Sequence, residues 1–301
     1  MKTYNVRPTT LSGFTSRKLH ATLAKMAKDH WSSTAYESAA AFVPKLTSKV
    51  VAYLDVQPND RILDVGCGDG ALTAQIAQAA SQGHVLGLDA SQSFIFTAQE
   101  KHTTPNCTFR LHDCTHLDQL PPAVDGTWDK VFSNAAMHWI LRNPHTRTAF
   151  FDNIYRALKP GGAFVFEQGG GGNVAEVQAA AIAALTHAGL SRDEAREASP
   201  WFFPTTRWIE ATLTKAGFEV EVCELEYRPT KLTADREDKS GGLEGWAKLF
   251  CAQYLEKVEE GKRAGVLREI CEILDAVIAR EEDGSKYLGY VRLRAVARKP
   301  V

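Results

Sequence analysis

The strongest chemical signal in the sequence is a glycine-rich turn followed by a distant aspartate. Within the run LDVGCGDG, Gly66, Cys67 and Gly68 come after an apolar strand pattern and before a helical one. Glycines let the backbone approach a ligand closely, and N–H groups at a helix N-terminus can contact it. Asp89 ends the next apolar strand, 23 residues after Gly66, where its carboxylate can accept hydrogen bonds from both hydroxyls of a ribose. The pattern predicts an adenosine-containing ligand, either NAD or an adenosyl sulfonium.

Polar or small residues also follow the next two predicted strands. Asp113, with Cys114 behind it, stands just past the third strand, where its carboxylate could accept a hydrogen bond from an adenine amino group. Asn134 and Ala135 end the fourth strand, and the aromatic Trp139 comes shortly after them. In a parallel sheet these strand ends meet at one edge, so the side chains should surround a common site.

Taken together, these motifs resemble the class I S-adenosylmethionine-dependent methyltransferases. LDVGCGDG corresponds to the glycine loop, GLDAS at 87–91 to the ribose-binding turn, and LKPGG at 158–162 to the segment before the fifth strand. The likeness extends to the trans-aconitate methyltransferase-like group of small-acid O-methyltransferases and covers about residues 30 to 300. That group commonly has Gln where this chain has His138. The segments that carry this second likeness include 31–36, NAAMHW at 134–139, 202–204, 216–218, 228–230, 245–246 and 290–300.

The resemblance implies S-adenosyl-L-methionine as the cofactor and S-adenosyl-L-homocysteine as the product. Trp31 and Tyr36 either cover the sulfonium, whose charge favours aromatic faces, or staple a helix. No metal is expected. The residues expected to bind the cofactor are Gly66, Cys67, Gly68, Asp89, Ala90, Asp113, Cys114, Asn134, Ala135, Trp31 and Tyr36.

Two neighbouring aromatic residues are the candidates for positioning the methyl acceptor. The Trp139 indole N–H can donate to a carboxylate while the ring forms the wall of a dry pocket, although a tryptophan here could also be a core residue. His138 could be a second donor to the acid, a general base or a packed histidine. Arg292 and Arg294 share one face of the last strand and could attract an acid or lie at the surface.

The absence of an evident general base favours an acceptor that is already ionised. A carboxylate is ionised at neutral pH, so its methylation needs alignment and exclusion of water but no base. We therefore predict an enzyme that esterifies a small organic acid, such as an aconitate-like, dicarboxylic or aromatic acid. One alternative is methylation of a carbon or phenolic oxygen with His138 as the base. A second is a nicotinamide-dependent oxidoreductase, because Gly66, Gly68 and Ala71 also fit the dinucleotide fingerprint. A third is a non-catalytic partner protein that binds the cofactor.

The surrounding patterns predict an α/β fold. Short apolar runs alternate with helical patterns from about residue 60, which is typical of a doubly wound, Rossmann-like parallel sheet. The resemblance implies seven strands with an antiparallel last strand. Two long amphipathic patterns before that strand predict a helical cap. We expect a tail and lid segment at 1–30, a cofactor-binding core at 31–229 and 286–301, and a cap at 230–285.

Composition bounds the partners and the compartment. The 301 residues carry a formal net charge of -1, which gives no global field to hold a nucleic acid. No apolar run approaches the roughly 20 residues of a membrane span. The six cysteines form no CxxC pair, and the first residues show no secretory signal. We therefore expect a cytoplasmic monomer or homodimer that acts on a small molecule, without a nucleic acid or membrane partner.

Overall fold

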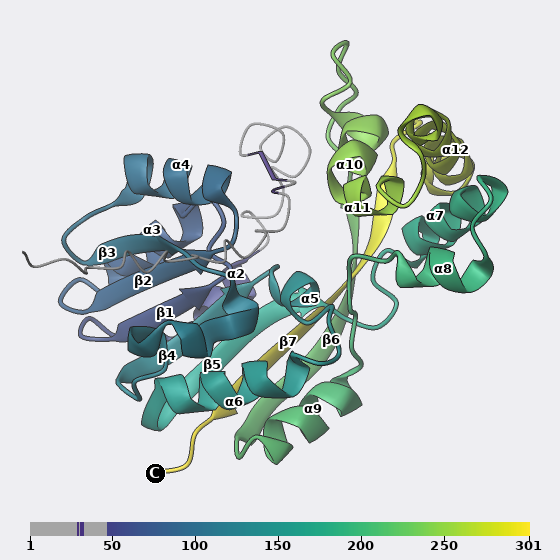
Figure 1. Ribbon diagram of the computed structural model, residues 1–301. Coiled ribbons are helices and arrows are strands. Elements are labelled where there is room, and N and C mark those ends of the chain that lie inside the picture. Colours follow the sequence, from purple (N-terminus) through teal and green to yellow (C-terminus); the bar gives the residue numbers. More distant parts are fainter. Residues whose placement is uncertain (1–28, 30, 33–46) are drawn as a thin grey trace, which may run out of the picture.

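A seven-stranded sheet forms the centre of the molecule (Figure 1). The computed structural model describes residue 29, residues 31–32 and residues 47–301. The strands are ordered β3-β2-β1-β4-β5-β7-β6, and β7 alone runs antiparallel to its neighbours, which confirms the predicted mostly parallel sheet. The strands are β1 (Arg61–Val65), β2 (His84–Asp89), β3 (Cys107–Leu111), β4 (Trp128–Asn134), β5 (Leu158–Gly169), β6 (Glu219–Lys231) and β7 (Tyr287–Arg298).

Helices cover both faces of the sheet, as expected for a doubly wound fold. One face packs against α2 (Ser48–Leu54), α3 (Ala71–Ala79) and α4 (Gln92–His102). The opposite face packs against α6 (Arg147–Ala157), α9 (Thr206–Lys215) and the short 3-10 segments η2 (Cys114–Gln119) and η3 (Pro121–Ala123). Tyr36, the second aromatic residue expected near the sulfonium, lies outside the described residues.

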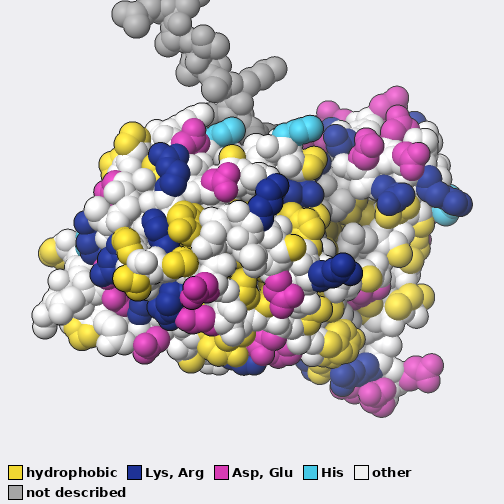
Figure 2. Space-filling view, turned by 90° about the horizontal axis from the view of Figure 1, so that it is seen from below, with side chains coloured by type: hydrophobic (Ala, Val, Ile, Leu, Met, Phe, Trp, Pro, Cys, Tyr) yellow, Lys and Arg dark blue, Asp and Glu magenta, His cyan; other side chains and the backbone are white. Residues whose placement is uncertain are grey.

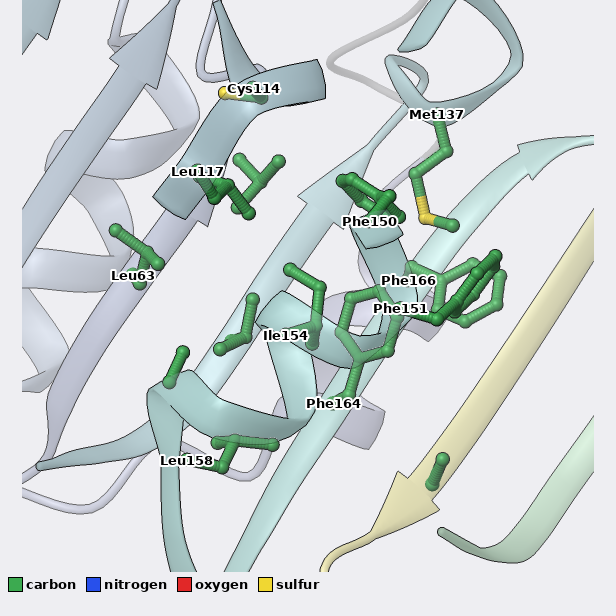
Figure 3. Packing of buried hydrophobic residues seen from close by; sticks show 14 of the residues in the cluster. Leu63, Cys114, Leu117, Met137, Phe150, Phe151, Ile154, Leu158, Phe164 and Phe166 are labelled. Atoms are coloured by element: carbon green, nitrogen blue, oxygen red, sulfur yellow. The ribbon is translucent and has the colours of Figure 1, made fainter. Parts of the chain in front are cut away.

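The core between α6 and β5 shows how residue spacing builds this layer. Phe150, Phe151 and Ile154 recur at helical spacing and point from α6 toward Phe164 and Phe166 of β5 (Figure 3). All five side chains are buried. β5 begins at the end of α6 and runs through the Lys159–Gly162 turn, so it starts five residues before the strand predicted at Ala163.

A second group of helices lies beyond the carboxyl ends of the strands and forms the cap. α10 (Gly242–Phe250), α11 (Ala252–Leu255) and α12 (Glu260–Ile278) lie within the expected 230–285 segment. They share one apolar cluster with α7 (Ala175–His187) and α8 (Arg192–Glu197), which precede β6 in the chain (Figure 1). The packed helical layer therefore contains helices that precede β6 in the sequence and helices that follow it. α5 (Met137–Ile140) is a single turn between the sheet and this layer.

Surface charge is mixed, and the six cysteines are free thiols. On the face shown in Figure 2, acidic and basic side chains alternate without a large area of one sign. Across the described ranges, no helix combines the length and the apolar character that crossing a membrane requires. The same ranges contain no cluster of three or more His, Cys, Asp or Glu side chains suited to a metal ion.

Candidate cofactor and acceptor site

A cavity of about 590 Å³ opens at the carboxyl ends of β1, β2, β3 and β4. The strand order reverses between β1 and β4, and ligands of doubly wound folds bind at such a switch point. Most of the lining residues come from the strand ends and the helix starts after them, from α5 and the turn after it, and from the cap, and others come from residues 29 and 31 and from Pro200. They are Asp29, Trp31, Asp64, Gly66, Cys67, Gly68, Asp69, Ala71, Leu72, Asp89, Ala90, Ser91, Phe94, Asp113, Cys114, Thr115, Phe132, Asn134, Ala135, Trp139, Ile140, Arg142, Pro200, Gln253 and Glu256.

The glycine turn is fixed by the strand beside it. The N–H groups of Gly66 and Cys67 both donate to the Leu88 carbonyl, at 2.8 and 3.0 Å. Gly66 adopts a φ of +80°, and a Cβ there would lie 2.2 Å from the Cβ of Ala136. Gly68 also has a positive φ, +58°, but a Cβ there would meet no atom within 4 Å. The turn therefore leaves open space directly above Gly68, as a ligand resting on the backbone requires.

Asp89 connects the end of β2 to this turn. Its Oδ2 accepts from Gly68 N and its Oδ1 from Ser91 N, each at 2.9 Å. Burial raises the pKa of the Asp89 carboxyl to about 6, although these two N–H groups oppose the shift. The carboxylate is therefore ionised at neutral pH and lines the cavity, where it can accept hydrogen bonds from ribose hydroxyls.

Three other polar groups of the cofactor end are placed by local structure. Asp64 is buried below the turn and accepts from Thr73 Oγ1 at 2.6 Å, and burial raises the pKa of its carboxyl to about 7. It braces the turn, because its described partner is a side chain of the following helix. Burial holds the pKa values of the Cys67 and Cys114 thiols well above their usual range, so both thiols are neutral.

The remaining cofactor candidates reach the same cavity. The exposed Asp113 uses its Oδ1 to accept from the backbone and hydroxyl of Thr115, at 2.9 and 2.8 Å. Asn134 Oδ1 is buried and has no hydrogen-bond partner among the described residues. Ala135 adopts a φ of +57°, a conformation that costs energy for a residue with a Cβ and is concentrated at functional turns. Ala90 lies at the exposed rim.

Trp31 lies between the sheet domain and the cap. Its ring centroid is 5.6 Å from Phe94, 5.0 Å from Trp139 and 5.9 Å from Phe250 of α10. Asp29, which the sequence reasoning missed, accepts at its Oδ2 from Ser91 Oγ at 3.0 Å. Trp31 thus contacts aromatic rings of both the sheet domain and the cap at the edge of the cavity, and its role over the cofactor stays a prediction.

The structure separates His138 from Trp139. Trp139 lines the cavity, whereas the buried His138 does not. The His138 Nδ1 accepts from Gly169 N at 3.4 Å, and its ring lies 5.5 Å from that of Phe203. Burial, reinforced by the charge of Arg292, lowers the pKa of this imidazole well below its ordinary value. His138 is therefore a neutral packed side chain that does not line this cavity, which favours the packed histidine among the three roles considered for it.

Three residues at the cap end of the cavity carry no motif in the sequence. Arg142 follows α5, Gln253 belongs to α11, and Glu256 lies one residue past α11. Arg142 Nη1 donates to Gln253 Oε1 at 2.9 Å. No histidine, lysine or tyrosine is among the described lining residues, and Arg142 is the one cation among them, facing six carboxyl groups.

Comparison with known proteins decides between the adenosine ligands. A model of the methyltransferase domain family matches residues 62–162. The methyltransferase C70.08c of Schizosaccharomyces pombe is 34% identical over 280 residues, which cover 91% of this chain and 100% of that protein. This chain belongs to the class I S-adenosylmethionine-dependent methyltransferases. The methyltransferase therefore takes S-adenosylmethionine as its cofactor, and the open space at Gly68, the ionised Asp89 and the unpartnered Asn134 oxygen fit that molecule.

Other relatives cover less of the methyltransferase or share less of its sequence. Trans-aconitate 2-methyltransferase of Deinococcus radiodurans is 32% identical over 38% of this chain and 40% of its own. Malonyl-[acyl-carrier protein] O-methyltransferase of Methylovorus is 26% identical over 79% of this chain and 82% of its own.

Solved structures share the fold. A methyltransferase of Bacillus halodurans has a TM-score of 0.55 at 19% identity and covers 85% of this chain and 100% of its own. Phosphoethanolamine N-methyltransferase 2 of Haemonchus contortus has a TM-score of 0.52 at 19% identity, and the match covers 89% of this chain and 57% of its own. That structure was solved with phosphomonomethylethanolamine and S-adenosylhomocysteine.

Proposed function

We propose that this methyltransferase esterifies the carboxylate of a small organic acid. The observation that carries the proposal is the composition of the cavity beyond the glycine turn. Trp139, Arg142 and Gln253 offer hydrogen-bond donors there, and the described lining holds no histidine, lysine or tyrosine that could take a proton from an alcohol, phenol or amine. Such a wall suits an acceptor that arrives ionised.

The residues of the cavity account for the requirements of the transfer. S-adenosylmethionine supplies a methyl group on a positively charged sulfur. Trp31 and Trp139 exclude water on the cap side, and the lining carboxyl groups favour a cationic ligand. A carboxylate oxygen forms the new O–C bond as the C–S bond breaks, the electron pair remains on sulfur, and no proton moves. The chain then has only to bind and align its two ligands.

The alternative with His138 as a base loses its support. Methylation of a carbon or a phenolic oxygen requires a base within hydrogen-bond reach of the acceptor. His138 is buried against Phe203 and does not line the cavity, so another group would have to remove the proton. Glu256 is the remaining candidate near the cap, and it is exposed at the rim.

Two relatives support an acidic acceptor by their names. The Deinococcus protein is called a trans-aconitate 2-methyltransferase, and the Methylovorus protein is called a malonyl-[acyl-carrier protein] O-methyltransferase. The Haemonchus protein is an N-methyltransferase on the same fold, so fold alone does not choose the acceptor. The free thiols favour a reducing compartment, and we place the proposed reaction in the cytoplasm.

The test is product analysis with a mixed pool of acids. The purified protein is incubated with methyl-labelled S-adenosylmethionine and aconitic, dicarboxylic and aromatic acids, and labelled products are identified by mass spectrometry. We expect methyl esters that mild alkali hydrolyses. The variant His138→Gln should retain most of this turnover, whereas loss of a base would cost roughly 100-fold or more. Alkali-stable products, or such a loss in His138→Gln, would contradict the proposal.

A further inference from the structure

The backbone of Arg142 is anchored at the cap end of the cavity. It lies in the turn after α5, and its carbonyl oxygen accepts from Arg147 Nη2 at 3.1 Å. Arg147 Nε also donates to the Leu141 carbonyl at 2.6 Å, and its guanidinium lies 3.5 Å from the centre of the Phe202 ring. Arg147 therefore fixes the end of α5, and the Arg142 backbone starts from a defined position.

The Arg142 side chain keeps most of its donor capacity for a ligand. A guanidinium has five N–H donors. The described contacts of this side chain consist of one hydrogen bond, from Nη1 to Gln253 Oε1, and Arg142 is half-buried in the cavity wall. The partner is a neutral amide, so the charge of Arg142 is not compensated by it. The Gln253 amide group adds N–H donors from the cap side of the same opening.

We infer that Arg142 and Gln253 hold a second, non-reacting carboxylate of the acceptor, which rests on the proposed function. An arginine that paired both oxygens of the reacting carboxylate would block them and weaken the nucleophile. The productive arrangement therefore places the reacting carboxylate beside Trp139 and another anionic group on Arg142. The favoured acceptors are diacids, and the favoured product is the monoester.

Electrostatics make this assignment specific to Arg142. The other ionisable groups of the described lining, apart from the two neutral thiols, are Asp and Glu side chains, which disfavour an anionic acceptor. Glu256 is also close to the cap end, but it is exposed and therefore more strongly screened by solvent. After one methyl transfer, the product retains one carboxylate. That carboxylate stays on Arg142 while the ester faces the sulfur, so a second methylation requires the product to turn around without an anchor.

The experiment compares dicarboxylic acids from succinate to adipate with their monoamides, which keep one reactive carboxylate and replace the other by a neutral group of the same shape. We expect wild-type kcat/KM to favour the diacid by about 10- to 100-fold, the range of a charge-assisted hydrogen bond. Arg142→Gln should bring this ratio close to one. Gln253→Glu, which places a carboxylate against Arg142, should do the same. Arg110→Gln, at an exposed position on β3 outside the cavity, should leave the ratio unchanged.

The outcomes separate this inference from the proposed function. S-adenosylhomocysteine binding, measured by thermal shift, verifies that each variant is folded. Two results would overturn the role of Arg142 and leave carboxyl methylation standing. In one, the wild-type protein forms esters but its diacid-to-monoamide ratio of kcat/KM is near one; in the other, that ratio is high and Arg142→Gln does not lower it. A wild-type protein that esterifies no acid while binding the cofactor would overturn both.

Discussion

Gly68 offers a sharp test of where the cofactor lies, because the protein itself leaves the space above it empty. The perturbation is Gly68→Ala. The new Cβ would meet no protein atom within 4 Å, so the substitution adds no clash within the chain. Because Gly68 lines the cavity, the methyl group would instead take up space at the cavity wall that the protein itself leaves empty. Its effect on ligand binding should therefore exceed its effect on stability.

Both magnitudes follow from the geometry. At a φ of +58°, alanine loses about 1 kcal/mol relative to glycine, which lowers the Tm of a chain of this size by about 2 to 4 °C. If the cofactor rests on this backbone, the methyl group overpacks the contact at a cost of about 1 to 3 kcal/mol. The Kd for S-adenosylhomocysteine should then rise about 5- to 150-fold.

A matched control isolates the backbone cost. Gly284 has a φ of +68°, no atom within 4 Å of a Cβ, and a position outside the cavity. Gly284→Ala should lower the Tm by a similar amount and leave the Kd unchanged. Calorimetric titration with S-adenosylhomocysteine measures the Kd, and thermal unfolding measures the Tm. Placement of the cofactor on this backbone is refuted if Gly68→Ala binds S-adenosylhomocysteine as tightly as Gly284→Ala.

Three further predictions concern the side chains around this turn. Lowering the pH from 7 to 5 should weaken S-adenosylhomocysteine binding about tenfold, since a pKa of about 6 leaves Asp89 mostly protonated at pH 5; a pH-independent Kd would contradict this. Asp64 has a pKa of about 7 when folded and about 3.9 when unfolded, so it makes the free energy of unfolding fall as the pH rises from about 4 to 7. Asp64→Asn should reduce this dependence of the free energy of unfolding on pH, measured by urea titrations at pH 5 and 8. An unchanged dependence would contradict the raised pKa of Asp64. Trp139→Phe keeps the aromatic wall but removes its N–H, which should raise the KM for the acid about fivefold without changing cofactor affinity; equal KM values would exclude that hydrogen bond.

The cofactor end could be read from the sequence because its determinants are local. The turn at Gly66 and Gly68 lies within one run of residues, and Asp89 and Asn134 each stand where a predicted strand ends. Parallel pairing then brings these strand ends together without further information. The strands themselves were predictable from short apolar runs. β6 extends further than its run because its pairing with β7 continues to Lys231, and β5 begins earlier because Leu158 pairs with Trp128 of β4.

The acceptor end could not be read in the same way, because its residues meet only through tertiary packing. Arg142 and Gln253 are 111 positions apart and come from separate layers. The direction in which His138 points is also set by tertiary packing. Trp139 and Ile140 of α5 line the cavity, whereas His138 packs against Phe203 and accepts from Gly169 N. The sequence placed both residues at the site and could not decide which of them turns inward.

The two arginines of the last strand show how sheet register decides a function that residue type leaves open. Arg292 and Arg294 do share a face of β7, as the sequence predicts, but β5 places Glu167 on the same face. Arg292 Nε and Arg294 Nε donate to the two oxygens of Glu167, at 2.9 and 2.5 Å, and Arg228 Nη2 donates at 3.0 Å. Burial alone would raise the pKa of Glu167, yet the three guanidinium groups lower it below its ordinary value.

These arginines therefore stabilise an internal carboxylate, and Arg294 also donates to Glu226. Their charge is largely compensated inside the sheet, and neither is among the residues that line the cavity. An acid that enters the cavity consequently meets Arg142, whose described partner is neutral. Recognition of an anionic acceptor then depends on a cation from the turn after α5 and an amide from the cap, and no pattern along the chain joins these two residues.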